Sequence, residues 1–145
     1  MYAEIILKKG KESSVLRRHP WVFSGAIATD FSLITDGTCV RVMSSTGKYL
    51  GTGHFQHGSI AVRMLTFEEE ELNQKFWNQR VKRMVNLRET LGLLSSEGIC
   101  RLCHGEGDEL PGLILDYYNG VVVMQCHSVG MLNHLTEITN ALKTA

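Results

Sequence analysis

A change in hydrophobic pattern at Glu68 divides the sequence into two parts that must fold by different rules. Before this residue, apolar and polar residues alternate over short runs interrupted by glycine, which favours half-buried β-strands. After it, residues 68–92 contain no proline, and their apolar residues recur at the spacing of one helix face. We therefore expect an α+β chain of two domains, residues 1–67 and residues 68–145.

The first domain is expected to be a small barrel-like β structure, because its apolar runs are short and closely spaced. The runs that predict strands are residues 3–8, 25–28, 38–44, 48–56 and 59–66. The turns are expected at Asp36-Gly37, Thr46-Gly47 and His57-Gly58. Residues 8–24 are too basic for a core strand and are interrupted by Gly10 and Pro20, so we expect a loop there, with one helical turn at residues 14–19.

The second domain is expected to be a small α/β unit with a long helix, a β-hairpin and a C-terminal helix. Four glutamates at residues 68–71 would lie in the first turn of the long helix and complement its dipole, and Gly92 would cap its end. A strand is expected at residues 99–103. Asn119-Gly120 joins two apolar runs and predicts a type I′ hairpin turn, because both central residues of that turn need positive φ. A last helical stripe follows at Leu132, Leu135, Ile138 and Leu142.

Composition and charge limit the class of protein. The chain has 145 residues, of which 43% are hydrophobic, and no run of about 18 apolar residues that would predict a membrane span. The N-terminus lacks the basic-then-apolar order of an export signal, so we expect a cytoplasmic location. Residues 1–65 hold eight Lys/Arg against four Asp/Glu, and residues 66–145 hold seven against eleven. This asymmetry indicates a polyanionic partner for the first part, or a chance segregation of solvated charges.

Cys100, Cys103 and His104 have the C-x-x-C-H spacing of c-type haem attachment. The segment is expected to be a strand, on which residues three apart point to opposite faces, so the two thiols would diverge. Zinc could recruit these residues together with Cys126 and His127, but the spacing is unlike that of a zinc finger. We expect neither haem nor zinc, and we interpret the cysteines as small buried apolar side chains.

The loop that follows carries carboxylates at Glu106 and Asp108 between glycines. Two neighbouring carboxylates could bind a cation or transfer protons. They could equally fix the geometry of a turn. The sequence leaves both interpretations open.

Two segments carry a family resemblance: "LKKGKESSVLRRHPWVFSGAI", residues 7–27, and "RLCHGEGDELPGLILDYYNGVVVMQ", residues 101–125. Together they resemble the bacterial S-adenosylmethionine-dependent methyltransferases that modify cytosine C5 in large-subunit ribosomal RNA. The resemblance implies an N-terminal PUA domain, which is an RNA-binding pseudo-barrel, followed by a central α/β domain. In that family a Rossmann-like catalytic domain that uses S-adenosylmethionine comes next, and the chain is expected to end before it.

The chain departs from that family in the residues that carry the chemistry. The family's reaction needs a cysteine nucleophile in a Pro-Cys setting, and none of the four cysteines follows a proline. The glycine pairs Gly51/Gly53 and Gly105/Gly107 lack the third glycine of a cofactor-binding turn. We therefore expect no catalytic, cofactor-binding or metal-binding residue here, but the RNA-binding portion of a larger enzyme. A stand-alone RNA-binding adaptor is the alternative, and a metal or redox module built on the cysteines is a more distant third.

The candidate RNA-binding residues cluster near the N-terminus, where cations can neutralise phosphates and a ring can stack on an unpaired base. They are Lys8, Lys9, Lys11, Arg17, Arg18, His19 and Trp21. Trp21 could also be a core residue, and His54 and His57 could either line the same surface or be solvated loop residues. The apolar stripe of the last helix suggests that it packs on a partner, either the catalytic domain or, in a homodimer, a second copy.

Overall fold

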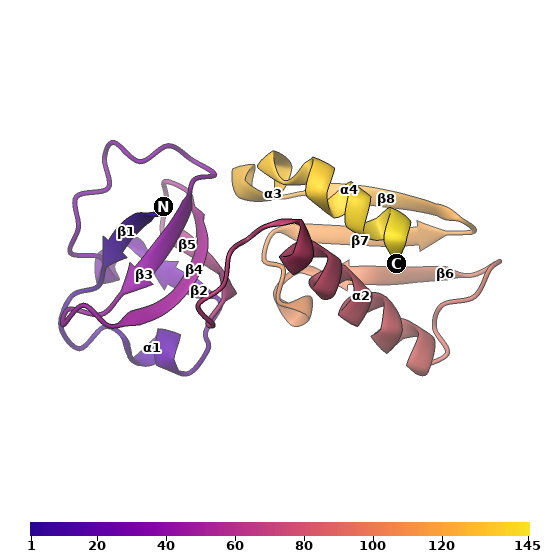
Figure 1. Cartoon of the computed structure of the whole chain (residues 1–145), viewed down its shortest axis with the longest axis horizontal. Coiled ribbons are helices and arrows are strands. Elements are labelled where there is room, and N and C mark those ends of the chain that lie inside the picture. The colour runs from indigo at the N-terminus through magenta and orange to yellow at the C-terminus, as the bar shows by residue number, and fades with distance from the viewer. The chain divides into compact units, whose positions relative to one another are not determined.

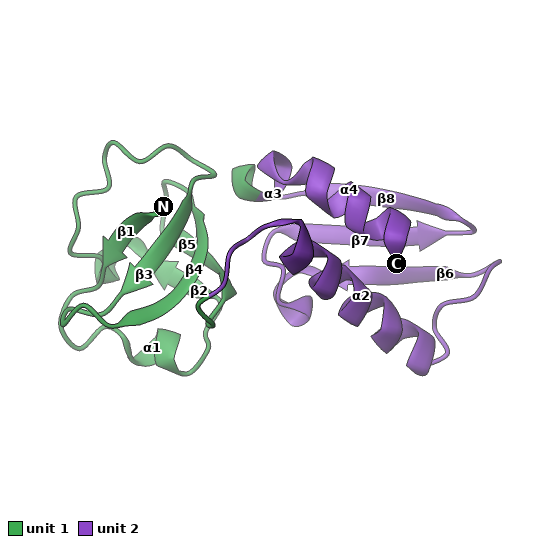
Figure 2. Ribbon diagram, viewed as in Figure 1, with its two compact units in different colours: residues 1–69, 128–130 green, residues 70–127, 131–145 purple.

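The computed structural model describes all 145 residues and divides them into two compact units (Figure 2). The N-terminal unit comprises residues 1–69 and 128–130, and the C-terminal unit comprises residues 70–127 and 131–145. The first unit is built on a five-stranded sheet and the second on a three-stranded sheet with helices (Figure 1). The predicted α+β class is confirmed.

The sheet of the N-terminal unit has the strand order β1-β3-β4-β5-β2. Its strands are β1 (Ala3–Ile6), β2 (Trp21–Phe23), β3 (Cys39–Met43), β4 (Tyr49–Phe55) and β5 (Ile60–Thr66). Strand β1 runs parallel to β3, and every other neighbouring pair is antiparallel. Because β1 and β2 form the two edges, the sheet is open and the barrel is not closed. A short helix α1 (Ser13–Leu16) and a 3₁₀ turn η1 (Ser24–Ala26) precede and follow β2.

One face of this sheet forms the hydrophobic core of the unit. Val22, Phe55 and Val62 are at most 2% exposed, and they lie opposite one another across β2, β5 and β4. The remaining members of the core are Ile5, Leu7, Val15, Ile27, Val40, Val42, Leu50, Ala61 and Met64. In β3 the expected alternation holds for Val40 and Val42, whereas β4 and β5 are buried along most of their length, Ala61 included.

Strand β2 corrects the expectation that residues 8–24 form only a loop. Trp21–Phe23 pairs antiparallel with β5, with Val22 opposite Val62. The strand has three residues, which is too short for an alternation pattern to reveal it. The expected strand at residues 25–28 is instead η1 followed by a single bridge between Leu7 and Ile27.

The C-terminal unit has the antiparallel sheet order β6-β7-β8. Its elements are α2 (Gln74–Thr90), β6 (Ile99–His104), a 3₁₀ turn η2 (Gly105–Asp108), β7 (Leu113–Tyr118), β8 (Val121–Cys126), α3 (Val129–Asn133, which starts in the N-terminal unit) and α4 (Leu135–Thr144). Helices α2 and α4 pack against each other and cover one face of the sheet (Figure 1). The Asn119-Gly120 turn has φ values of 44° and 88°, which confirms the predicted type I′ hairpin.

The long helix starts later than expected, so the glutamates at residues 68–71 precede it and do not form its first turn. Asn73 is the N-cap, and its side-chain oxygen accepts hydrogen bonds from the backbone N–H groups of Lys75 at 3.0 Å and Phe76 at 3.3 Å. These hydrogen bonds satisfy backbone N–H groups at the start of the helix, which have no carbonyl partner within the helix. Gly92 ends the helix at φ 67°, as predicted.

The C-terminal helical segment is broken into α3 and α4 at His134. The break changes which side chains face inward: Met131 and Ile138 are fully buried, whereas Leu132 is 57% and Leu135 is 43% exposed. The expected single stripe is therefore divided: Ile138 packs inside the C-terminal unit, whereas Leu132 and Leu135 stay exposed. The longest helix, α2, has 17 residues, and no helix combines the length and the apolar character needed to cross a membrane.

The N-cap gives a first testable prediction. Replacing Asn73 by alanine removes the acceptor for two helix N–H groups and should destabilise the C-terminal unit by about 1 kcal/mol. Amide hydrogen exchange at Lys75 and Phe76 measures the loss directly. Glu71→Gln is the control, because Glu71 is exposed and precedes the helix. Equal exchange rates in the two variants would show that Asn73 does not cap α2.

Candidate RNA-binding surface

The basic segment, residues 8–19, connects β1 to β2 and is held at both ends by backbone hydrogen bonds. At its start, the Lys8 N–H donates to Ala26 O at 2.8 Å, and at its end the His19 N–H donates to Ser14 O at 3.0 Å. In the middle, Val15 of α1 is 2% exposed and belongs to the core of the unit. The segment therefore follows a defined path with its polar side chains outside.

The structure brings the seven predicted RNA-binding residues into this segment and the strand that follows. Lys9, Lys11 and Arg17 are exposed and form no ion pair. Lys8 differs, because its Nζ donates to Gly25 O at 3.0 Å.

Arg18 is attached to the end of β5. Its guanidinium donates to Glu68 Oε1 at 2.9 Å and lies 5.6 Å from the centroid of the Phe67 ring. Both members of the pair are about two-thirds exposed, so the pair is a weak one that a stronger anion can displace. Arg18 also has φ 60°, the left-handed region, where a substitution would change the backbone as well as the charge.

His19, Trp21 and Phe23 place three rings beside one another, and we call these three residues the aromatic edge. The ring centroids are 5.9 Å apart for His19 and Trp21, and 6.3 Å apart for each of the other two pairs. The backbone N–H of Trp21 donates to His19 Nδ1 at 3.1 Å, and the same ring nitrogen lies 3.2 Å from the carbonyl oxygen of Trp21. Trp21 is half-buried, and the core position of β2 belongs to Val22.

The two histidines that flank Phe55 have different environments. His57 is exposed, and its Nδ1 pairs with Asp36 Oδ1 at 2.8 Å. Hydrogen bonds from the His57 backbone and side chain lower the pKa of Asp36. His54 is 1% exposed, so it does not line a solvent-accessible surface.

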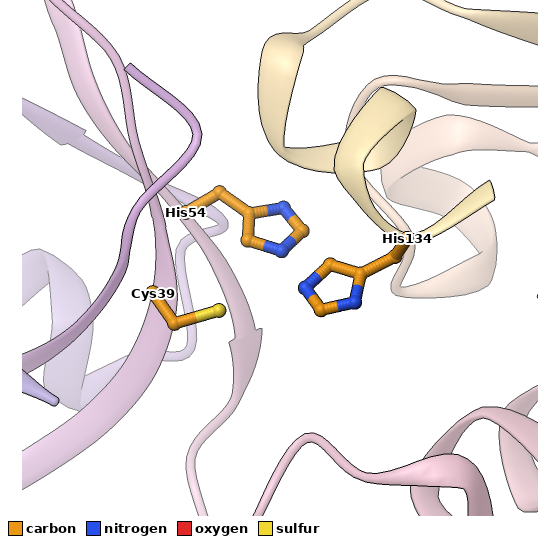
Figure 3. A group of neighbouring side chains, drawn as sticks. All are labelled: Cys39, His54 and His134. Carbon is orange, nitrogen blue, oxygen red and sulfur yellow. The ribbon is translucent and has the colours of Figure 1, made fainter. Parts of the chain in front are cut away.

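His54 of β4 lies directly opposite Cys39 of β3, and the two side chains point to the same side of the sheet (Figure 3). Gly130, in the short stretch that completes the N-terminal unit, approaches the His54 ring so closely that a Cβ would lie 2.2 Å from its Cγ. His134, also drawn in Figure 3, belongs to the C-terminal unit, where its ring centroid lies 4.9 Å from that of Trp77.

The loop carboxylates Glu106 and Asp108 lie in η2. Both oxygens of Asp108 are engaged by Arg88 of α2: Nη1 donates to Oδ1, and Nη2 donates to Oδ2 at 2.8 Å. The backbone N–H of His104 also donates to Oδ2, at 2.7 Å. Hydrogen bonding to Asp108 raises the pKa of Arg88. Glu106 is exposed beside this network.

Two further arginines of helix α2 form ion pairs with a carboxylate at the end of η2. Arg80 and Arg83 both donate to the carboxylate of Glu109, at the end of η2. Glu109 has φ 60°, a conformation that favours glycine, and the two arginines hold its side chain against the helix. The ion pairs join residues 20 to 29 positions apart in sequence, so no local pattern could have revealed them.

This network yields a second prediction. Asp108→Asn removes the charge that balances Arg88, whose side chain is only 13% exposed, and should destabilise the protein by about 2–4 kcal/mol. Urea unfolding followed by circular dichroism measures the change. The neighbouring variant Glu106→Gln, on an exposed side chain, should change stability by less than about 0.5 kcal/mol. Comparable losses in both variants would contradict a structural role specific to Asp108.

The two thiols of the C-x-x-C-H segment do not diverge as expected. A β-bulge between Arg101 and Cys103 shifts the register by one residue, and Cys100 and Cys103 are both buried, at 9% and 0% exposure. Cys103 Sγ donates to Leu113 O at 3.4 Å. Burial raises the pKa of the Cys103 thiol to about 12. These are the properties of buried apolar side chains.

The raised pKa gives a third prediction. At about pH 8 the Cys103 thiol is protonated and shielded, so iodoacetamide should alkylate it far more slowly in the folded protein than in concentrated urea. Mass spectrometry of the proteolysed protein gives the rate for each cysteine. Alkylation of Cys103 at the same rate with and without urea would disprove the burial.

The glycine pairs Gly51/Gly53 and Gly105/Gly107 lie in regular elements of the fold. Gly53 lies in β4, where a Cβ would be 2.2 Å from the backbone oxygen of Arg63 on β5. Glycine is therefore required for the close approach of these strands. Gly105 and Gly107 lie in η2, which leads into β7. Neither pair lies between a strand and an α-helix.

The basic segment and the aromatic edge lie within a part of the chain that matches a known domain family. Residues 5–67 match the family described as PUA-like domain. Over 148 aligned positions the chain is 39% identical to the "Ribosomal RNA large subunit methyltransferase I" of Aeromonas hydrophila, and it is 34% identical over 146 positions to the proteins of that name from Shigella boydii and Escherichia coli. These alignments include 99% of the chain, which spans 37% of the length of each relative.

Solved structures agree with the fold. A putative SAM-dependent methyltransferase from Streptococcus mutans superposes with a TM-score of 0.82 at 17% identity, over 98% of this chain and 37% of that one. A crystal structure of a putative methyltransferase complexed with SAH gives the same values. At this identity the likeness establishes the arrangement of the backbone.

Proposed function

We propose that this chain is the RNA-binding portion of an S-adenosylmethionine-dependent methyltransferase that acts on cytosine C5 of large-subunit ribosomal RNA in the cytoplasm. Residues 1–67 are the RNA-binding domain, and residues 68–145 are a central domain that connects it to the catalytic part. The identity of 34–39% to large-subunit ribosomal RNA methyltransferases over 99% of the chain is the observation that carries the proposal.

The electrostatics of the N-terminal unit support this function. Lys9, Lys11 and Arg17 are exposed and have no carboxylate partner, so each can neutralise a phosphate and release its counterion. Glu12 is the single acid among residues 8–24. By contrast, Arg80, Arg83 and Arg88 in α2 are engaged by Glu109 and Asp108.

In this proposal the methyl donor and the nucleophilic cysteine belong to parts of the enzyme outside these residues. S-adenosylmethionine supplies the methyl group, and what this chain supplies is the binding and orientation of the RNA. A homodimer remains a prediction, for which sedimentation of the purified protein is the test.

The test is a fourth prediction, made by measuring binding of the chain to a large-subunit ribosomal RNA transcript between about 50 and 200 mM salt. The variant Lys9→Gln/Lys11→Gln/Arg17→Gln should bind at least 10-fold more weakly at low salt. Its slope of log affinity against log salt should fall by about 2, because each lost phosphate contact on unpaired RNA contributes about 0.7.

The matched control is Lys75→Gln/Lys82→Gln/Lys143→Gln, which removes three exposed, unpaired cations from the C-terminal unit and changes the net charge equally. It should bind within about 2-fold of the unmodified protein with little change of slope. If both variants lost the same affinity, only overall charge would matter, and the basic segment would not be the RNA contact.

A further inference from the structure

Phe23 is a large aromatic residue of the N-terminal unit that lies outside its core. It lies on the edge strand β2 next to Val22, which is 2% exposed, yet Phe23 itself is 49% exposed. The alternation of the strand sends Val22 to one face of the sheet, and Trp21 and Phe23 to the other. A phenylalanine kept half in water contributes little to the core, so its ring is available to a ligand.

The backbone that carries Phe23 is held in place on both sides. Val22 pairs with Val62 of β5, and the Ser24 N–H donates to Ser59 O at 2.9 Å. On the other side, the Met64 N–H donates to Pro20 O at 2.8 Å. The aromatic edge is therefore presented by a sheet and not by a free loop, which lowers the entropy lost when a ligand binds.

The spacing of the rings determines how a ligand can meet them. A base inserted between two rings needs them about 7 Å apart and parallel, which is twice an aromatic contact distance of about 3.5 Å. The centroids of the aromatic edge are 5.9 to 6.3 Å apart, and Trp21 is inclined at 74° to His19 and at 90° to Phe23. No slot exists between these rings, so a planar ligand must lie on an outward ring face.

Cations bracket the aromatic edge along the chain. On one side, Arg17 and Arg18 directly precede His19. On the other, Lys8 Nζ donates to Gly25 O, two residues after Phe23. A ligand with a planar apolar face and negative charge on either side of it matches this arrangement.

We propose that the aromatic edge stacks unpaired nucleobases, with Phe23 as the principal stacking residue, so that the surface takes single-stranded RNA. The inference rests on the proposed RNA-binding function and narrows its substrate class. In a duplex the faces of the bases are covered by neighbouring bases and cannot stack on the aromatic edge. In a loop or a single strand these faces are exposed. The surrounding positive charge favours RNA over an apolar peptide.

The test is a fifth prediction, on the full 145-residue chain with an RNA oligonucleotide of about 12 nucleotides, single-stranded or annealed to its complement. Phe23→Leu keeps an apolar side chain but removes the ring. Fluorescence anisotropy should show a 5- to 100-fold loss of affinity for the single strand, with an unchanged salt slope and unchanged duplex binding. Tyr118→Leu, which alters a 44% exposed ring of the C-terminal unit, is the matched control and should have no effect.

Tryptophan emission gives an independent measurement. Trp77 is fully buried and Trp21 is half-buried at the aromatic edge, so quenching by the single strand reports on Trp21. We expect quenching by the single strand and none by the duplex at equal saturation. Thermal melts of Phe23→Leu and Tyr118→Leu identify any loss of folding.

The outcomes separate this inference from the proposed function. If Phe23→Leu binds the single strand as tightly as the unmodified protein while the Lys9/Lys11/Arg17 variant loses affinity, stacking is overturned and RNA binding stands. Equal losses for single strand and duplex in Phe23→Leu also overturn stacking. If the unmodified protein binds neither RNA in a salt-dependent way, the proposed function fails and this inference fails with it.

Discussion

The pairing of β2 with β5 is the interaction on which the candidate surface depends. Val22 opposite Val62 anchors a strand of three residues to the core, and backbone hydrogen bonds from Met64 and Ser24 close the register on either side of it. At the other end of the basic segment, the Leu7 N–H donates to Met43 O at 2.9 Å. Once β1 and β2 are paired in the sheet, the loop of residues 8–19 adds only a small entropic cost of closure. The sheet can therefore stay folded although the cations of this loop repel one another.

The C-terminal unit uses its charges in the opposite way. Arg88 of α2 is nearly buried against Asp108, and Glu109 draws Arg80 and Arg83 to the end of η2. Charges neutralised at such short range contribute little field at a distance. The arginines of α2 therefore stabilise the packing of helix on loop, and the positive field that would steer a polyanion comes from the N-terminal unit, where Lys9, Lys11 and Arg17 form no ion pair.

Local chemistry decided which elements could be predicted from the sequence. The Asn119-Gly120 hairpin and the Gly92 helix end follow from positive φ, which these residues adopt at low cost, and both were confirmed. Strands β3, β4 and β5 follow from short apolar runs bounded by glycine turns. Strand β2 was missed because three residues carry no period. The cysteines were misplaced because a β-bulge at Arg101–Cys103 leaves no mark in the sequence.

Only part of the candidate site could be predicted from the sequence. Clustered cations are visible in the sequence, so the basic segment could be named, whereas the exposure of Phe23 depends on which face β2 turns to the core. The partner of Asp108 could not be named either, since Arg88 lies 20 residues away and a pairing across that distance exists only once helix and loop have packed.

The resolved pKa shifts of the carboxylates and thiols keep each of these groups in one protonation state near neutral pH. Hydrogen bonds from His57 and Arg101 lower the pKa values of Asp36 and Asp116, and burial raises those of Cys103 and Cys126. Each shift moves the group further from neutral pH, so the carboxylates stay charged and the thiols stay protonated. A general acid or base needs the opposite shift. Asp36 has a structural role in the N-terminal unit: its Oδ1 accepts a hydrogen bond from the backbone N–H of His57 at 2.7 Å, which fixes the turn that follows β4.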